Sequence, residues 1–84
     1  MHKDLATING YALLEVVSGS MEPTIKVGDM IIIDTKAKDY QKGDIVTFYD
    51  INNAFVTHRI IEIDGKEMVT KGDNKANSID DPTS

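Results

Sequence analysis

The sequence contains no cysteine, no cluster of basic residues and no long apolar run. Without cysteine the chain has no disulfide framework, no thiol nucleophile and no thiolate metal site. Its apolar runs, such as residues 30–33, are far shorter than the roughly 18–20 residues that cross a bilayer. Lys and Arg number 9 against 14 Asp and Glu, for a net charge of -5. This balance disfavours nucleic acid or an anionic membrane surface as an electrostatic partner.

What remains is one small domain. A chain of 84 residues buries only about 60–65% of its unfolded surface, so its core is expected to be thin. The apolar fraction of 40% with 27% charged residues argues against disorder. We expect residues 1–10 to be a lead-in that is frayed or briefly helical, and residues 11–84 to form a partial domain, an excised fragment truncated at its C-terminus.

The strand pattern predicts an all-β fold. Short segments rich in β-branched and aromatic residues alternate with turn residues. The expected strands span residues 11–18, 30–35, 45–51, 54–63 and 66–71. Asn52-Asn53 suits a hairpin turn, and Asp64-Gly65 fits a type I′ turn, which makes the last three strands a meander. The polar, aperiodic residues 73–78 predict a loop.

The segment SGSMEPT, residues 18–24, follows the first expected strand with two hydroxyls just before a proline. Gly19 frees the backbone and Pro23 fixes φ, so Ser20 is expected to project from a rigid corner. Such a corner suits a nucleophile. The structural alternative is a helix start in which Ser20 is the N-cap and Pro23 lies in the first turn.

A serine nucleophile requires a base and a group that orients the base. His58 lies mid-strand, where alternation places Val56, His58 and Ile60 on one face; its alternative role is a packed or half-exposed strand histidine. Candidate orienting carboxylates are Asp73, Asp80 and Asp81. The alternative for Asp73 is an ordinary turn residue, and the alternative for Asp80 and Asp81 is a solvated C-terminal tail. For Asp81 we favour the tail.

Four motifs together resemble those of type I signal peptidases in order and approximate spacing. They occupy residues 18–24, 43–46, 56–59 and 71–74. His58 stands where the common bacterial enzymes carry lysine, which is similar to the endoplasmic-reticulum and archaeal subtype that also occurs in some Gram-positive bacteria. The resemblance implies a small signal-peptidase/LexA-like catalytic β domain.

The resemblance also implies roles for single residues. Ser20 becomes the nucleophile and His58 the general base, while the Ser18 hydroxyl and the Ser20 amide form the oxyanion hole. Asp73 is the acid of the Gly-Asp-Asn motif. Asp80 is favoured as the second aspartate because residues 77–80 resemble the bacterial motif, although Asp81 stays open.

The implied activity is that of a serine endopeptidase that removes signal peptides from pre-proteins after small residues, of the Ala-x-Ala type. The substrate would add as a strand along residues 13–18. Its side chains would meet Leu13, Val16, Met21 and Val56. Neither a metal nor a cofactor is implied. The full-length enzyme would be held in the cell membrane by segments outside this chain, with the catalytic domain on the extracytoplasmic face and this fragment itself soluble.

Two other functions are possible from the sequence. A self-cleaving repressor of the LexA type shares the fold and the Ser-Met-x-Pro-Thr corner, but such proteins resemble Ser/Lys enzymes and carry a helix-turn-helix domain. His58 argues against that class. A non-catalytic β module that binds peptides is the second alternative. A serine-directed probe on Ser20 distinguishes enzyme from module, and the flanking gene sequence distinguishes peptidase from repressor.

Overall fold

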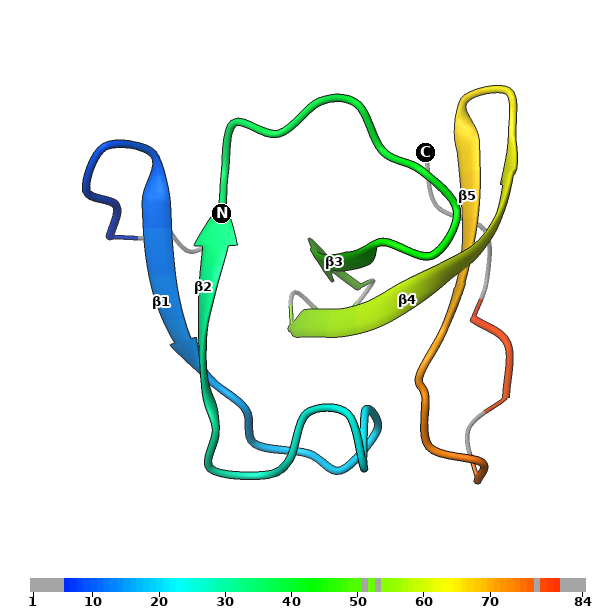
Figure 1. Ribbon diagram of the computed structural model, residues 1–84, viewed down its shortest axis with the longest axis horizontal. Coiled ribbons are helices and arrows are strands. Elements are labelled where there is room, and N and C mark those ends of the chain that lie inside the picture. The colour runs from blue at the N-terminus through cyan, green and yellow to red at the C-terminus, as the bar shows by residue number, and fades with distance from the viewer. Residues whose placement is uncertain (1–5, 51, 53, 77, 81–84) are drawn as a thin grey trace.

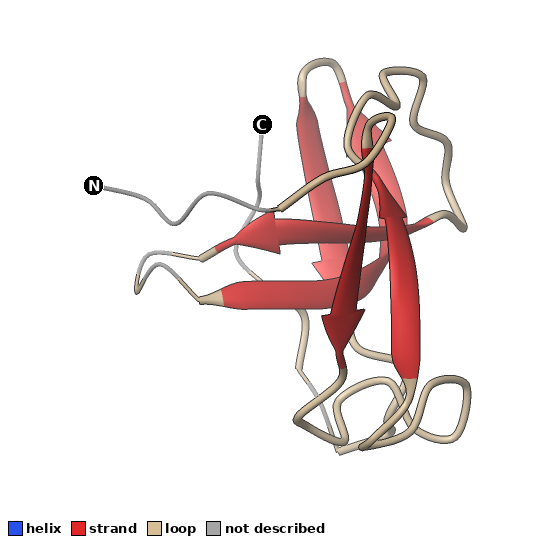
Figure 2. Cartoon of the chain, turned by 90° about the vertical axis from the view of Figure 1, so that its left-hand side faces the viewer, coloured by secondary structure: helices blue, strands red, loops and turns tan. Residues whose placement is uncertain are grey.

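The computed structural model describes residues 6–50, 52, 54–76 and 78–80. Its five strands are β1 (Tyr11–Glu15), β2 (Met30–Asp34), β3 (Ile45–Tyr49), β4 (Phe55–Asp64) and β5 (Glu67–Lys71). Within the described ranges there is no helix, as Figure 2 shows, so the all-β prediction is confirmed. Ile8 forms an isolated bridge with Tyr11 rather than part of a helix, while residues 1–5 of the expected lead-in lie outside the described residues.

The strands form two antiparallel sheets, β1–β2 and β3–β4–β5 (Figure 1). The second is the expected meander. The first half of β4 pairs with β3 and its second half with β5, and Figure 1 shows β4 curving between the two. Ile61 is an extra residue, because Ile60 pairs with Thr70 and Glu62 with Val69. Such a bulge bends a strand and increases its twist.

Several strand ends differ from the predictions. β2 and β3 end at Asp34 and Tyr49, earlier than expected, and β4 and β5 begin at Phe55 and Glu67, one residue later than expected. β1 ends at Glu15 rather than at residue 18, although Val16 still exchanges backbone hydrogen bonds with the next segment, donating to Asp29 O and accepting from Gly28 N at 2.8 Å each. The chain therefore leaves the ladder before it reaches the serines. At the other end of the fold, β4 extends to Asp64, one residue beyond the expected end.

The hairpin between β4 and β5 also differs in its turn. Asp64 pairs with Glu67, so the two loop residues are Gly65 and Lys66 rather than Asp64 and Gly65. Gly65 has φ 61° and Lys66 has no positive φ. A positive φ at the first loop residue alone is the pattern of a type II′ turn, not of the predicted type I′ turn. The predicted Asn52-Asn53 turn includes residue 53, which lies outside the described residues.

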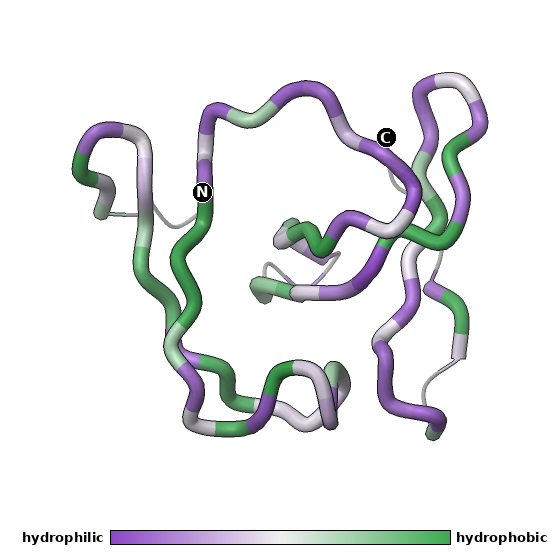
Figure 3. The backbone as a smooth tube through the Cα atoms, in the orientation of Figure 1, coloured by the Kyte–Doolittle hydropathy of each residue, from purple (hydrophilic) through white to green (hydrophobic). Residues whose placement is uncertain are grey.

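The core of the described chain is thin. The buried apolar residues are Ala12, Met21 and Ile60, accompanied by buried His58 and Thr70. Apolar residues also lie along β1 and β2 in Figure 3. One face of this sheet is exposed; we call it the outer face, and it consists of Tyr11, Leu13, Met30 and Ile32, which are 53%, 60%, 55% and 72% exposed. The described residues include no helix with the length and hydropathy to cross a membrane.

Candidate active site

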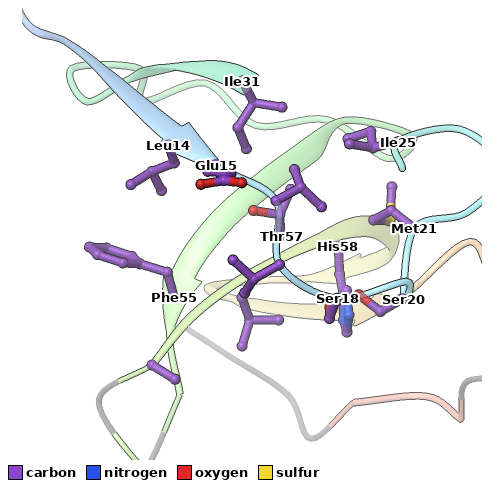
Figure 4. A pocket seen from close by; sticks show the side chains of 14 residues that line it. Leu14, Glu15, Ser18, Ser20, Met21, Ile25, Ile31, Phe55, Thr57 and His58 are labelled. Carbon is purple, nitrogen blue, oxygen red and sulfur yellow. Dashed lines mark hydrogen bonds between the residues drawn. The ribbon is translucent and has the colours of Figure 1, made fainter. Parts of the chain in front are cut away.

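A cavity of about 480 Å³ lies where the end of β1, the β1–β2 loop and the first half of β4 meet (Figure 4). We call it the Ser20–His58 pocket. Its lining residues are Leu14, Glu15, Val16, Val17, Ser18, Ser20, Met21, Ile25, Ile31, Ala54, Phe55, Val56, Thr57 and His58. Figure 4 shows Ser18, Ser20 and His58 at the same end of the pocket; the rest of its wall is mostly apolar, with the polar side chains of Glu15 and Thr57 among it.

The β1–β2 loop holds Ser20 in a tight turn. Glu22 N donates to Gly19 O at 3.1 Å, and Thr24 N donates to Met21 O at 2.8 Å. Met21 is 2% exposed, and its Sδ accepts a hydrogen bond from Asp73 N at 3.3 Å. Ser20 therefore adjoins an anchored residue at a corner, and the alternative of a helix N-cap is not found. Ser18 Oγ lies 3.3 Å from Ser20 Oγ.

His58 is oriented by Asp80. The side chain of His58 is buried on β4, and its Nδ1 is hydrogen-bonded to Asp80 Oδ2. An ionised carboxylate only accepts hydrogen bonds, so Nδ1 carries the hydrogen in this pair. The other ring nitrogen, Nε2, then has a free lone pair when the imidazole is neutral. This is the tautomer that a general base requires.

Asp80 is itself held by Thr70 on β5. Thr70 Oγ1 donates to Asp80 Oδ2 at 2.7 Å, and Asp80 N donates to Thr70 O at 2.9 Å. Beside this pair, Ile79 forms an isolated antiparallel bridge with Lys71. The residues just before Asp80 therefore run alongside β5, which fixes the carboxylate from both its main chain and its side chain.

Asp73 is hydrogen-bonded to Arg59 and not to His58. Arg59 Nε and Nη2 donate to the two carboxylate oxygens of Asp73 at 2.9 and 2.8 Å, and Thr24 Oγ1 donates to Oδ2 at 2.7 Å. Arg59 Nη1 also donates to Gly43 O at 2.8 Å. Hydrogen bonding from Arg59, supported by that from Thr24 and opposed by burial, lowers the pKa of Asp73 to about 2, and the same pair raises the pKa of Arg59. This cluster joins three loops and β4.

Asn74 connects the same loop to the serine corner. Its Nδ2 donates to Gly19 O at 2.9 Å, and its backbone N donates to Ser20 O at 2.9 Å. Its Oδ1 accepts a hydrogen bond from Ala76 N at 3.0 Å. The Gly-Asp-Asn motif thus reaches the β1–β2 loop through Asn74, and reaches both that loop and β4 through Asp73.

The structure brings most of the predicted site residues together. Ser18, Ser20, Met21, Val16, Val56 and His58 line one pocket, and Asp80 lies behind His58. Two predicted residues are not at the pocket. Asp73 is bonded to Arg59 and Thr24 instead. The side chain of Leu13 is on the exposed outer face, and Leu14 lines the pocket because successive strand residues point to opposite faces. Asp81 lies outside the described residues.

Sequence reasoning assigned no role to Thr24, Thr70 or Asn74. Thr70 is fully buried, and a polar residue at a core-facing strand position was the available signal. The partners of Thr24 and Asn74 lie 49 and 55 positions away, and no local pattern encodes such contacts. Among the described residues, no group of three His, Asp or Glu side chains is arranged to hold a metal ion.

Comparison with known proteins gives consistent matches. The family described as Peptidase S24-like matches residues 2–81. The chain is 44% identical over 81 residues to signal peptidase I W of Bacillus subtilis, an alignment that covers 89% of this chain and 43% of that protein. It is 36% identical over 75 residues to the signal peptidase complex catalytic subunit SEC11 of Scheffersomyces stipitis, covering 82% and 43% of the two chains. The SEC11 subunit of Yarrowia lipolytica is 35% identical over 74 residues, covering 82% and 42%.

The chain therefore spans less than half the length of these relatives. No solved structure matches it.

Proposed function

Because the chain belongs to the Peptidase S24-like family, we propose that it forms part of the catalytic domain of a serine endopeptidase that removes signal peptides from exported pre-proteins. The observation that carries the proposal is the pocket shared by Ser20 and His58, with Asp80 bonded to the far nitrogen of the imidazole. The relatives named signal peptidase favour this activity over the LexA-type repressor and the non-catalytic module.

In the proposed mechanism, Ser20 Oγ attacks the scissile carbonyl while His58 Nε2 accepts the hydroxyl proton. Asp80 stabilises the imidazolium that forms and keeps Nε2 directed at the reacting atoms. The tetrahedral intermediate collapses when His58 returns the proton to the leaving amine, which yields an acyl-enzyme and the free mature chain. Water, activated by the same imidazole, then hydrolyses the ester and regenerates Ser20.

The backbone N–H of Ser20 and the hydroxyl of Ser18 are the proposed oxyanion donors. The proximity of the two hydroxyls places Ser18 where it can serve the same substrate carbonyl as Ser20. Donors at such a position stabilise charge that develops only in the transition state. Ser18→Ala is therefore expected to lower turnover by about 10² to 10³.

The signal peptide is proposed to bind in extended form along the end of β1, beside Leu14, Val16 and Val56. Among the described strands β1 pairs with β2 alone, so its other backbone edge would provide affinity, and the mostly apolar wall would select side chains by size. A preference for small residues before the cleaved bond, as in Ala-x-Ala, is part of this proposal. The full-length protein is proposed to act at a membrane, on the side where exported chains emerge.

The test uses Ser20→Ala, His58→Ala and the double substitution in the full-length protein, with cleavage of a pre-protein as the assay. Each single change is expected to lower kcat by about 10⁴ or more, and the double change to be little worse, because groups that act as a unit lose similar amounts when removed singly. His2→Ala and Ser84→Ala are the matched controls and should cleave normally. Additive losses at Ser20 and His58 would contradict the dyad, and an inactive wild-type protein would contradict the function.

A further inference from the structure

Asn74 contacts two successive peptide groups of the β1–β2 loop, which contains Ser20. Its side-chain amide donates to Gly19 O and its backbone N–H donates to Ser20 O, both at 2.9 Å. The first of these carbonyls belongs to the peptide group that also contains the Ser20 N–H. Asn74 therefore acts on the same rigid plane as the proposed oxyanion donor.

The geometry of a trans peptide fixes where that N–H points. In a planar trans peptide the C=O and N–H bonds point in opposite directions. Gly19 O accepts from Asn74 Nδ2 at 2.9 Å and also from Glu22 N at 3.1 Å, so the Ser20 N–H is directed away from both donors. Ser20 lines the pocket and Asn74 does not. Among the described residues, no group accepts a hydrogen bond from the Ser20 N–H, which leaves it available to a ligand.

Asn74 is itself fixed in this orientation. Ala76 N donates to its Oδ1 at 3.0 Å, which turns Nδ2 toward Gly19. The neighbouring residue, Asp73, is clamped by Arg59 through two hydrogen bonds. The donor that orients the peptide plane is thus held on both sides before any substrate binds, and such preorganisation is what gives an oxyanion hole its effect.

We infer that Asn74 is a positioning residue of the oxyanion hole, which holds the Gly19–Ser20 peptide plane so that the Ser20 N–H faces the developing oxyanion. The inference rests on the proposed function. Asn74 touches no reacting atom, and its side chain acts through the Gly19–Ser20 peptide plane, which Glu22 N also holds from within the loop. Loss of its side-chain donor should therefore weaken transition-state stabilisation and leave ground-state binding of the substrate unchanged.

The sharpest variant is Asn74→Asp in the full-length protein. The new side chain has the same shape and can still accept from Ala76 N, but it presents an oxygen instead of an N–H to Gly19 O. We expect kcat for pre-protein cleavage to fall by about 10- to 100-fold, a part of the loss seen when an oxyanion donor is removed outright, with KM within about twofold of wild type. Asn52→Asp, the same change at an exposed loop residue, is the control and should leave both constants unchanged.

Two kinetic results would overturn the inference: wild-type kcat and KM in Asn74→Asp, or a raised KM with unchanged kcat. A measurement that needs no activity separates this inference from the proposed function. The residual dipolar coupling of the Ser20 N–H in ¹⁵N-labelled protein reports its direction. We expect that coupling to change in Asn74→Asp and not in Asn52→Asp. If the coupling were unchanged the positioning role would be wrong, whereas absence of cleavage by the wild-type protein would count against the function.

Discussion

His58 and Arg59, which are adjacent on β4, are each hydrogen-bonded to a different aspartate. His58 faces the pocket and is bonded to Asp80, whereas Arg59 faces the other side of the strand and is bonded to Asp73. The chemical consequence differs, because Asp80 controls which imidazole nitrogen is protonated and Asp73 neutralises a guanidinium that ties loops together. Carboxylates of the same type, seven positions apart, therefore have separable effects.

We predict that Asp80→Asn and Asp73→Asn separate activity from stability. Asn at position 80 can donate to Nδ1 and stabilise the wrong tautomer, so kcat should fall by about 10² to 10⁴ with little change in the melting temperature. Asn at position 73 loses the charge that Arg59 requires, so the free energy of unfolding should fall by about 1–3 kcal/mol. Pre-protein cleavage and thermal unfolding of both variants measure the difference. Equal losses of activity and stability in the two would contradict it.

A second prediction follows from the lowered pKa of Asp73. Because the carboxyl titrates near pH 2 in the folded protein, against an ordinary value of 3.8, the folded state favours its ionised form. The stability from this group is therefore fully present above about pH 4 and is lost as the pH falls toward 2. Unfolding by denaturant at a series of acidic pH values should show this loss in the wild type and a flatter profile in Asp73→Asn. Parallel profiles would refute the linkage.

At the residue scale, the sequence pointed to Ser20 and His58 as one site and favoured Asp80 without deciding among the aspartates, and it did not show what holds these residues. The motifs indicate these residues because a serine nucleophile requires a base, and the base requires a group that orients it. The supporting contacts, from Asn74 to the serine loop and from Thr70 to Asp80, join segments that only the folded chain brings together. The core-facing position of Thr70 and the place of Asn74 in the 71–74 motif mark the two residues, but nothing local in the sequence identifies their partners.

At the scale of elements, the five strands could be predicted because alternation and turn residues mark them locally. Their ends could not, since a strand stops where its partner's hydrogen bonds stop. β1 ends three residues early, at Glu15, because its partner β2 begins at Met30. The β4–β5 turn lies one residue later than predicted because Asp64 pairs with Glu67 in the ladder. Gly65 is therefore the first loop residue and has the positive φ.

A substitution in β5 tests whether this strand positions Asp80. Thr70→Val keeps the shape of the side chain and removes the hydroxyl that bonds to Asp80. We expect kcat to fall by about 5- to 10-fold, equivalent to the roughly 1–1.5 kcal/mol of one hydrogen bond, because Asp80 is oriented less firmly. Thr47→Val, on β3, is the matched control: it removes a hydroxyl that is hydrogen-bonded to Thr57 and not to Asp80. A similar loss of kcat in both variants would show that the effect is not specific to Asp80.

At the scale of the whole molecule, four large apolar residues on the outer face of β1–β2 are more than half exposed, while only three apolar residues of the described chain are buried. Exposed apolar patches of this kind are rare on isolated monomers. Leu13 and Ile32 are direct cross-strand partners on the outer face, and both are more than half exposed. Their burial contributes little to the folding of this chain, in contrast to that of Ile60, which is fully buried.

We therefore predict that Leu13→Thr combined with Ile32→Thr lowers the binding of an apolar fluorescent dye to the native chain. The melting temperature should stay within a few degrees of wild type, because neither side chain is packed in the core and threonine retains β propensity. Ile60→Thr is the control and should destabilise by about 2 kcal/mol or more, since it places a hydroxyl in the core. The prediction fails if the double variant melts as early as Ile60→Thr.

The opposite orientation of His58 and Arg59 makes the site sensitive to the spacing of residues in β4. One residue inserted between them would put both side chains on the same face, so either the imidazole or the guanidinium would lose its aspartate. Changes of chain length near the site are therefore tolerable only in the turns that flank β4 or beyond the bulge at Ile61, where the ladder already accommodates an unpaired residue. An engineer who lengthens this protein should leave that dipeptide uninterrupted.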